Sequence, residues 1–243
     1  MNIMFLMGGR NTGESAASYP VYLSEVHNHL ILESQIYYVQ KISPDRIIFC
    51  FKKEDIENYH VDFIAQELAG NAQIVPVYGQ TKGAICTALL ASKYIDNDEE
   101  LFLFSIDDCV DEALPVILDH FRNEQSDAGV VSFRSVHPRY SFVKVDDENA
   151  VCEFSEKRPI SRQALASIYY FRRGSEFVRC AKEVIRKDNP LNGNFYLSQT
   201  MNEMILSQKK ITVHHIASNT FHPMKTELQL ARYIRELEAM DKV

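Results

Sequence analysis

The chain has 243 residues, 46% of them apolar, and a formal net charge of −7 at pH 7. It is long enough to bury a full core, yet no stretch approaches the roughly 20 apolar residues of a membrane span, and its start lacks the basic and apolar segments of a secretory leader. We therefore expect a cytoplasmic protein without membrane contact, whose negative surface repels nucleic acid and whose ligands are small anions held by local cations or a metal ion.

The first half of the chain alternates short apolar runs with longer amphipathic segments. Two of these longer segments have apolar residues at helical spacing, Glu25–Val39 and Gly83–Tyr94. Strand-like runs occur at Ile3–Met7, Arg46–Phe51, Gln73–Val77, Leu101–Ser105 and Ala128–Phe133. The alternation predicts a parallel sheet with helices on both faces.

A glycine-containing turn follows the first predicted strand. Met7-Gly8-Gly9-Arg10 places two glycines where a buried strand must turn and where exposed backbone N–H groups could meet a phosphate. The turn matches neither the Gly-x-Gly-x-x-Gly pattern nor the P-loop pattern. A nucleotide site is the leading hypothesis, and a simple reversal of the chain is the alternative.

The pattern changes after residue 127. Two strands, Ser141–Val145 and Val151–Ser155, flank an acidic turn and predict a hairpin. Further strands are expected at Ala166–Arg172 and Ile211–Ile216, and helices at Ser175–Lys187, Phe195–Ser207 and Thr226–Met240. No linker or repeat interrupts the chain, which favours one domain over residues 1–243.

Several short segments then occur in a characteristic order. After Met7-Gly8-Gly9 come Gly83-Ala84-Ile85-Cys86-Thr87, Ser105-Ile106-Asp107-Asp108, Glu156-Lys157-Arg158-Pro159-Ile160-Ser161 and Asn194-Phe195-Tyr196. Over nearly its whole length the chain resembles the sugar-phosphate nucleotidyltransferases, and most of all a small bacterial branch found with surface-polysaccharide genes that includes the phosphoglutamine cytidylyltransferases. The resemblance implies a Rossmann-like α/β fold of three layers, α/β/α and GT-A-like, with a mostly parallel mixed sheet.

The same resemblance implies the reaction. An acceptor phosphate would attack the α-phosphorus of a nucleoside triphosphate, with CTP favoured, and pyrophosphate would leave; the product would serve capsule or surface-polysaccharide synthesis. Residues 1–127 would form a nucleotide-binding half and residues 128–243 an acceptor-binding half. A homodimer is compatible with the sequence.

Site residues follow by matching the motifs. The expected catalytic residues are Arg10, Asp107 and Lys157. The expected nucleotide-binding residues are Met7, Gly8, Gly9, Gln80, Gly83, Ala84 and Asp107. The expected acceptor-binding residues are Glu156, Lys157, Arg158, Asn194 and Tyr196, where Lys157 and Arg158 would neutralise a phosphate.

Magnesium is the expected cofactor. Asp107 follows a predicted strand and is the leading ligand, because Mg²⁺ prefers carboxylate oxygens and usually retains several waters. Asp108 is the second candidate, and the alternative is that one of the two carboxylates caps a helix starting near Asp111.

One segment departs from the family pattern. Tyr19-Pro20-Val21-Tyr22-Leu23 stands where the family has Phe-Pro-Lys-Pro-Leu, so Val21 replaces a lysine that meets phosphate. Two other functions therefore stay open beside an active transferase. One is a noncatalytic relative that binds a nucleotide or a partner protein; the other is a nucleotide-sugar glycosyltransferase that uses Asp107 and Asp108 to hold a metal ion.

Overall fold

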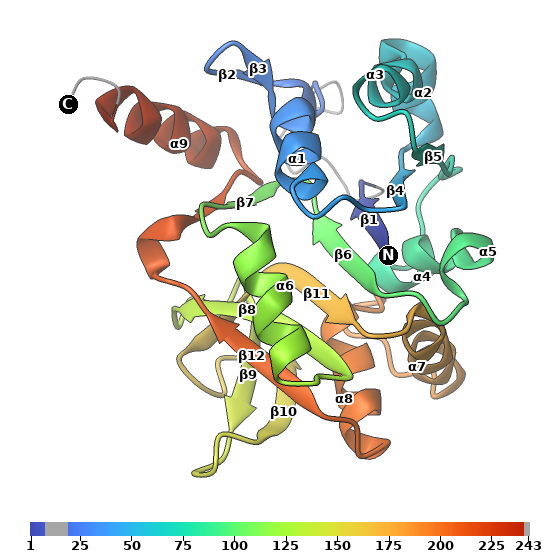
Figure 1. Cartoon of the computed structure of the whole chain (residues 1–243), viewed down its shortest axis with the longest axis vertical. Coiled ribbons are helices and arrows are strands. Elements are labelled where there is room, and N and C mark those ends of the chain that lie inside the picture. The colour runs from blue at the N-terminus through green and yellow to red at the C-terminus, as the bar shows by residue number, and fades with distance from the viewer. Residues whose placement is uncertain (8–18, 241–243) are drawn as a thin grey trace.

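The computed structural model describes residues 1–7 and 19–240, which are built around a nine-stranded mixed sheet (Figure 1). Seven strands follow the order β10-β9-β11-β6-β1-β4-β5, and β8 and β12 join through β11. The strands are β1 (Asn2–Leu6), β4 (Arg46–Cys50), β5 (Ala72–Ile74), β6 (Leu101–Ser105), β8 (Ala128–Arg134), β9 (Ser141–Val145), β10 (Val151–Glu156), β11 (Gln163–Phe171) and β12 (Ile211–His215). Strands β5, β4, β1 and β6 run parallel, whereas β11 is antiparallel to β6.

Helices cover both faces of this sheet. Ile3 and Phe5 of β1 pack on one face with α1, α3 and α6, whereas Met4 packs on the other with α4, α7 and α8. The helices are α1 (Ile31–Gln40), α2 (Lys53–Tyr59), α3 (Val61–Leu68), α4 (Ala84–Leu89), α5 (Ser92–Ile95), α6 (Leu114–Asn123), α7 (Gly174–Arg186) and α8 (Leu197–Leu206). Burial on both faces explains why the central strands are continuous apolar runs. The predicted three-layer α/β/α fold is confirmed.

The last helix, α9 (Glu227–Met240), lies outside these layers and extends away from the sheet (Figure 1). Its apolar residues Leu230 and Tyr233 pack against a small cluster made by Val26, Ile31 and Met224. Within the described part of the chain, no helix is both long and apolar enough to cross a bilayer.

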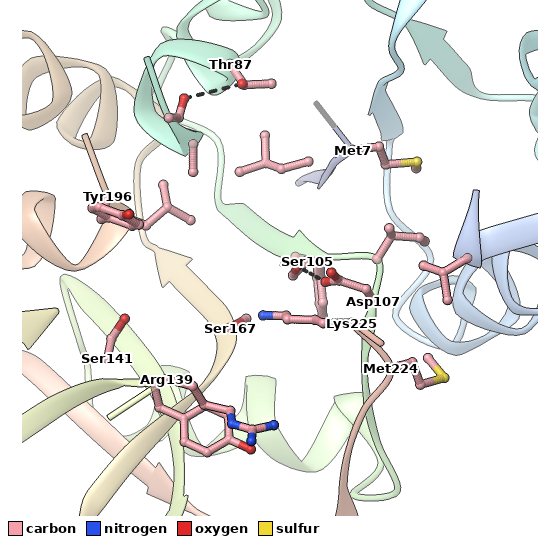
Figure 2. A pocket seen from close by; sticks show the side chains of 18 of the residues that line it. Met7, Thr87, Ser105, Asp107, Arg139, Ser141, Ser167, Tyr196, Met224 and Lys225 are labelled. Atoms are coloured by element: carbon pink, nitrogen blue, oxygen red, sulfur yellow. Dashed lines mark hydrogen bonds between the residues drawn. The ribbon is translucent and has the colours of Figure 1, made fainter. Parts of the chain in front are cut away.

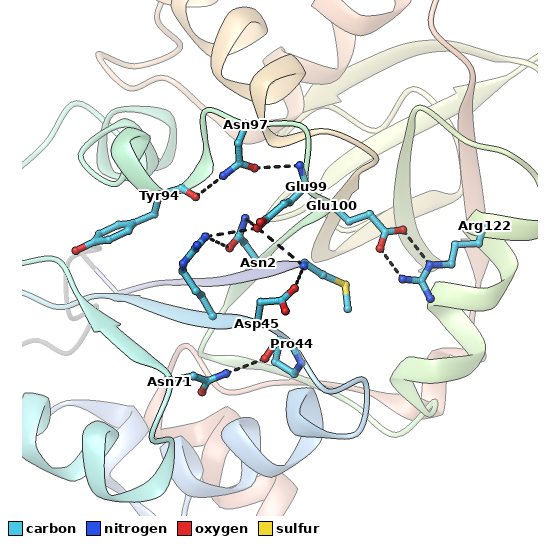
Figure 3. A network of polar contacts seen from close by, with 11 residues as sticks. Asn2, Pro44, Asp45, Asn71, Tyr94, Asn97, Glu99, Glu100 and Arg122 are labelled. Atoms are coloured by element: carbon cyan, nitrogen blue, oxygen red, sulfur yellow. Dashed lines mark hydrogen bonds and ion pairs between the residues drawn. The ribbon is translucent and has the colours of Figure 1, made fainter.

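Polar side chains join the amino ends of the central strands (Figure 3). The Asn2 side chain donates a hydrogen bond to Glu99 Oε2 at 2.9 Å and accepts one from Arg46 at 3.1 Å. Asn2 of β1 is thereby joined to Arg46 of β4 and to Glu99, which precedes β6. Arg122 of α6 binds Glu100 beside them. The charged side chains at this end of the sheet are therefore paired with one another.

Two predicted elements differ from the structure. The predicted helix Glu25–Val39 begins only at Ile31, because Glu25–Val26 (β2) and His29–Leu30 (β3) form a hairpin first. The residues between the two strands, His27 and Asn28, both have positive φ, as a tight two-residue hairpin turn requires. Likewise the predicted helix Gly83–Tyr94 is divided into α4 and α5.

A strand pair that the sequence did not predict joins the two halves of the chain. Asp108–Val110 (β7) pairs antiparallel with Phe221–Pro223 (β13), with Asp108 opposite Pro223. Val110 is therefore in a strand, and the helix expected near Asp111 starts at Leu114. Two short 3₁₀ helices, Val21–Leu23 (η1) and Ser218–Thr220 (η2), complete the described elements.

Candidate functional site

A cleft of about 1220 Å³ lies at the carboxyl ends of β1 and β6 and extends across β11. The predicted site residues that line it are Met7, Gln80, Gly83, Ala84, Asp107, Glu156, Lys157, Asn194 and Tyr196. Gly8, Gly9 and Arg10 lie outside the described residues. Ligands of open α/β sheets bind at this end of the strands, and the volume exceeds the roughly 300–1,000 Å³ of a drug-sized pocket. The cleft has room for a nucleotide and an acceptor together.

The two acidic residues after β6 have different environments. Asp107 lines the cleft and accepts a hydrogen bond from the Ser105 hydroxyl. The Asp108 side chain is 2% exposed and does not line the cleft. Only Asp107 is placed to meet a ligand directly.

Lys225 is the principal residue that the sequence analysis missed. Its Nζ lies 2.9 Å from Asp108 Oδ2, and its side chain is 41% exposed where it lines the cleft. The pairing of β13 with β7 brings Lys225 to the cleft. The Met224 N–H extends this strand pairing by donating a hydrogen bond to the Asp107 carbonyl at 2.7 Å. Figure 2 shows the Lys225 and Asp107 side chains side by side in the middle of the cleft, with Met7 and Thr87 on one side and Arg139 and Ser141 on the other.

The charges of Lys225, Asp108 and Asp107 influence one another. Burial lowers the pKa of Lys225, but the neighbouring carboxylates of Asp108 and Asp107 outweigh burial and hold that pKa above its usual value. Burial raises the pKa of the Asp108 carboxyl, and the ammonium opposes this effect. Lys225 therefore carries a positive charge at neutral pH.

Residues expected to bind the acceptor gather where the end of β10 meets the start of α8. Lys157 donates to the Tyr196 hydroxyl at 3.1 Å, and its Nζ lies 5.1 Å from the centre of that ring. Glu156 accepts hydrogen bonds from Ser198, at 3.0 Å, and from Ser141. A cation and a carboxylate that already binds hydroxyls suit a ligand that carries both a phosphate and hydroxyl groups.

Solved structures share this architecture. A nucleoside-diphosphate-sugar pyrophosphorylase from Vibrio cholerae is similar with a TM-score of 0.81 at 21% sequence identity, over 96% of this chain and 99% of that one. A UDP-glucose pyrophosphorylase complexed with UDP-glucose gives 0.79 at 12% identity, over 98% of each chain. A Bacillus anthracis protein assigned as a glucose-1-phosphate thymidylyltransferase, in complex with sucrose, gives 0.73 at 16% identity, over 95% of this chain and 92% of that one. The chain shares its fold with these three proteins. The sequence matches no protein-family model and no curated protein.

The two carboxylates expected to bind magnesium, Asp107 and Asp108, are placed differently, because only Asp107 lines the cleft. Asp108 is buried and held by the Lys225 ammonium, so a metal ion would have to displace a cation to reach it. Within residues 1–7 and 19–240, no three His, Cys, Asp or Glu side chains gather as a metal site. Asp107 alone fits Mg²⁺, because this ion is often bound by one carboxylate together with waters and substrate phosphates.

Arg158 lies outside the cleft. Its guanidinium binds Glu153 at 3.0 Å, and its side chain is 71% exposed. Arg139 lines the cleft instead and contacts His137 at 3.2 Å. Arg139 directly follows His137-Pro138 and belongs to no motif that the sequence analysis identified.

Two further observations concern the wall of the cleft. Gly83 has φ +104°, and a Cβ there would lie 2.4 Å from the Phe195 carbonyl oxygen, so packing requires this glycine whether or not a base binds nearby. Ser167 of β11 lines the cleft with φ +55°, where the register of β11 against β8 shifts between Leu165 and Tyr169. A β-bulge of this kind redirects a side chain beside a site.

Val21 also lines the cleft. The next residue, Tyr22, is fixed by a hydrogen bond of 2.6 Å from its hydroxyl to Asp55. The segment that departs from the family pattern is therefore part of the cleft wall, and at Val21 it presents an apolar side chain instead of an ammonium.

Proposed function

We propose that this protein is a nucleotidyltransferase that joins a nucleoside triphosphate to a small phosphorylated acceptor and releases pyrophosphate. The observation that carries the proposal is the cleft at the carboxyl ends of β1 and β6, where the Asp107 carboxylate at the end of β6 and three cations, Arg139, Lys157 and Lys225, line the same space. The fold shared with nucleotide-sugar pyrophosphorylases supports it.

The chemistry asks the protein mainly for positioning and charge neutralisation. The acceptor phosphate attacks the α-phosphorus in line with the leaving pyrophosphate, so both phosphates must be held close together. Lys157 binds the acceptor phosphate, and Glu156 orients the acceptor through its polar groups. Asp107 would hold Mg²⁺, which would supply stabilisation of negative charge on the transferred and leaving groups.

The finer features of the proposal come from the sequence resemblance. CTP is the favoured nucleotide, and a sugar phosphate, a polyol phosphate or a phosphorylated amino-acid derivative is the acceptor class. The proposed setting is bacterial surface-polysaccharide synthesis in the cytoplasm, and the proposed assembly is a homodimer.

A noncatalytic binding protein is the second candidate, favoured by one observation. Val21 lines the cleft where the resemblance places a lysine, and removal of a phosphate-binding charge costs transition-state stabilisation. A glycosyltransferase that uses Asp107 and Asp108 as a metal pair fits less well, because Lys225 holds Asp108.

Pyrophosphate release tests the proposal. The purified protein is incubated with CTP, UTP, dTTP, GTP or ATP, Mg²⁺ and a panel of phosphorylated acceptors, and pyrophosphate is measured with a coupled assay. We expect release that requires one acceptor class. Nucleotide binding without release from any pair in the panel would contradict the transferase proposal and favour the noncatalytic one.

Lys157→Ala is expected to raise the acceptor KM about 10- to 100-fold, the effect of losing one hydrogen bond to a charged group. The Kd of the nucleotide should change less than about twofold, because Lys157 lies beside Tyr196 on the acceptor side of the cleft. Arg158→Ala is the matched control, since the adjacent cation points outside the cleft. An equal effect of both substitutions, or an equal loss of acceptor and nucleotide binding, would contradict this assignment.

A further inference from the structure

The Lys225 ammonium occupies an unusual position for a lysine. It follows a strand, β13, that is paired with β7, so its backbone is fixed directly beside the end of β6. On one side it meets a carboxylate that is 2% exposed, and on the other side it faces the cleft. A positive charge is therefore held at a defined point of the cleft by the fold itself.

The charge balance shows what such a cation can do. Asp107 and Asp108 together would place two negative charges where a nucleotide phosphate has to approach, and like charges repel most strongly where water is excluded. Lys225 offsets the Asp108 charge from within the protein, at an Nζ–Oδ2 distance of 2.9 Å. A divalent ion is the usual solution to this repulsion, and an ammonium that contacts the cleft is another.

We propose that Lys225 is a built-in cation for the phosphates of the nucleotide, so that this protein binds a nucleoside triphosphate without a divalent metal ion. The inference rests on the proposed function for the location of the triphosphate, and it separates binding from turnover. Lys225 binds the phosphates, while the Mg²⁺ assigned to Asp107 acts on the chemical step.

Binding in the absence of metal is the direct test. The Kd values of CTP and of inorganic tripolyphosphate are measured by calorimetry with no acceptor present, once in EDTA and once in Mg²⁺. We expect the two conditions to agree within about tenfold for the wild-type protein. Tripolyphosphate carries no base, so its result holds even if the preferred nucleotide is not CTP.

Substitutions at Lys225 identify the group responsible. Lys225→Gln is expected to weaken binding of both probes in EDTA about 10- to 100-fold, whereas Lys225→Arg should keep the Kd within about threefold because the charge is retained. Lys187→Gln is the matched control: Lys187 is 43% exposed and pairs with Glu203 at 2.6 Å, but it does not line the cleft. The control should leave both Kd values unchanged.

Two further variants separate charge from folding. The double variant Lys225→Gln with Asp108→Asn leaves no unpaired buried carboxylate, so the protein should fold. Its binding of tripolyphosphate in EDTA should be as weak as that of Lys225→Gln alone. Lys225→Asp gathers three carboxylates, so its binding in EDTA should be lost and should return on addition of Mg²⁺ or Mn²⁺.

The outcomes are distinct. Binding by the wild type only in Mg²⁺, or binding in EDTA that survives Lys225→Gln, overturns the inference, even if pyrophosphate release is found. Metal-free binding that depends on Lys225 supports it, even if no acceptor yields pyrophosphate and the proposed transfer reaction is wrong.

Discussion

Asp107→Asn is expected to lower nucleotidyl transfer about 100- to 1,000-fold, the range found when one preorganised electrostatic group is removed from an active site. The side chain lines the cleft at the end of β6 and is the single carboxylate of the acidic pair that faces ligands. An amide keeps its shape and can still accept the Ser105 hydrogen bond, so the fold should be preserved. Turnover is measured at saturating CTP and acceptor in Mg²⁺, with circular dichroism as the check on folding.

Glu227→Gln is the control for this prediction. Glu227 lines the same cleft from the first turn of α9 and is exposed, so its loss changes the overall charge equally without touching the end of β6. We expect less than about threefold loss there. Since Asp107 repels a phosphate when no metal is present, Asp107→Asn should leave tripolyphosphate binding in EDTA unchanged or tighter. A fully active Asp107→Asn variant would refute the role given to Asp107.

The fold was predictable because its signals are local. Strands such as Leu101–Ser105 are buried on both faces, so each appears in the sequence as one continuous apolar run between helical patterns. The hairpin of β9 and β10 was equally clear from its acidic turn. The predicted start of α1 was wrong because Val26 and Leu30 fit a helical period. The turn at His27 and Asn28, which both have positive φ, produces no periodic pattern in the sequence.

The candidate site was predictable where it follows strand ends. Asp107 and Glu156 come at the ends of strands, and the motifs around them marked both positions. Asp108 and Arg158 show the limit of that reasoning. Each belongs to the same motif as the preceding residue, Asp107 or Lys157, but its side chain does not enter the cleft. Asp108 is paired with Lys225, and Arg158 is paired with Glu153.

Lys225 could not be found from the sequence for a different reason. The contact joins residues more than a hundred positions apart and depends on a strand pair of three residues on each side, too short to produce a periodic pattern. The segment before α9 also contains no glycine motif or apolar run. The principal cation of the cleft is thus a product of tertiary structure alone.

Gly83→Ala is expected to lower the free energy of unfolding by about 2–6 kcal/mol. The residue has φ +104° and ψ 179°, a region that is essentially restricted to glycine and costs other residues about 1–3 kcal/mol. In addition, a Cβ there would lie 2.4 Å from the carbonyl oxygen and 2.8 Å from the nitrogen of Phe195, and such overpacking typically costs about 1–3 kcal/mol. For a chain of this size the melting temperature should fall by roughly 4–24 °C.

Gly79→Ala provides the matched comparison. Gly79 also has positive φ, +64°, but its Cβ would meet nothing within 4 Å, so only the backbone cost of about 1 kcal/mol applies. Thermal and urea unfolding without ligand measure both variants. The Phe195 contact holds the segment before α4 against the segment before α8, through a hydrogen bond of 2.8 Å from the Phe195 N–H to the Lys82 carbonyl. If Gly83→Ala is as stable as Gly79→Ala but no longer binds CTP, then Gly83 serves the approach of the base, as the sequence resemblance implied, and not the packing of the cleft wall.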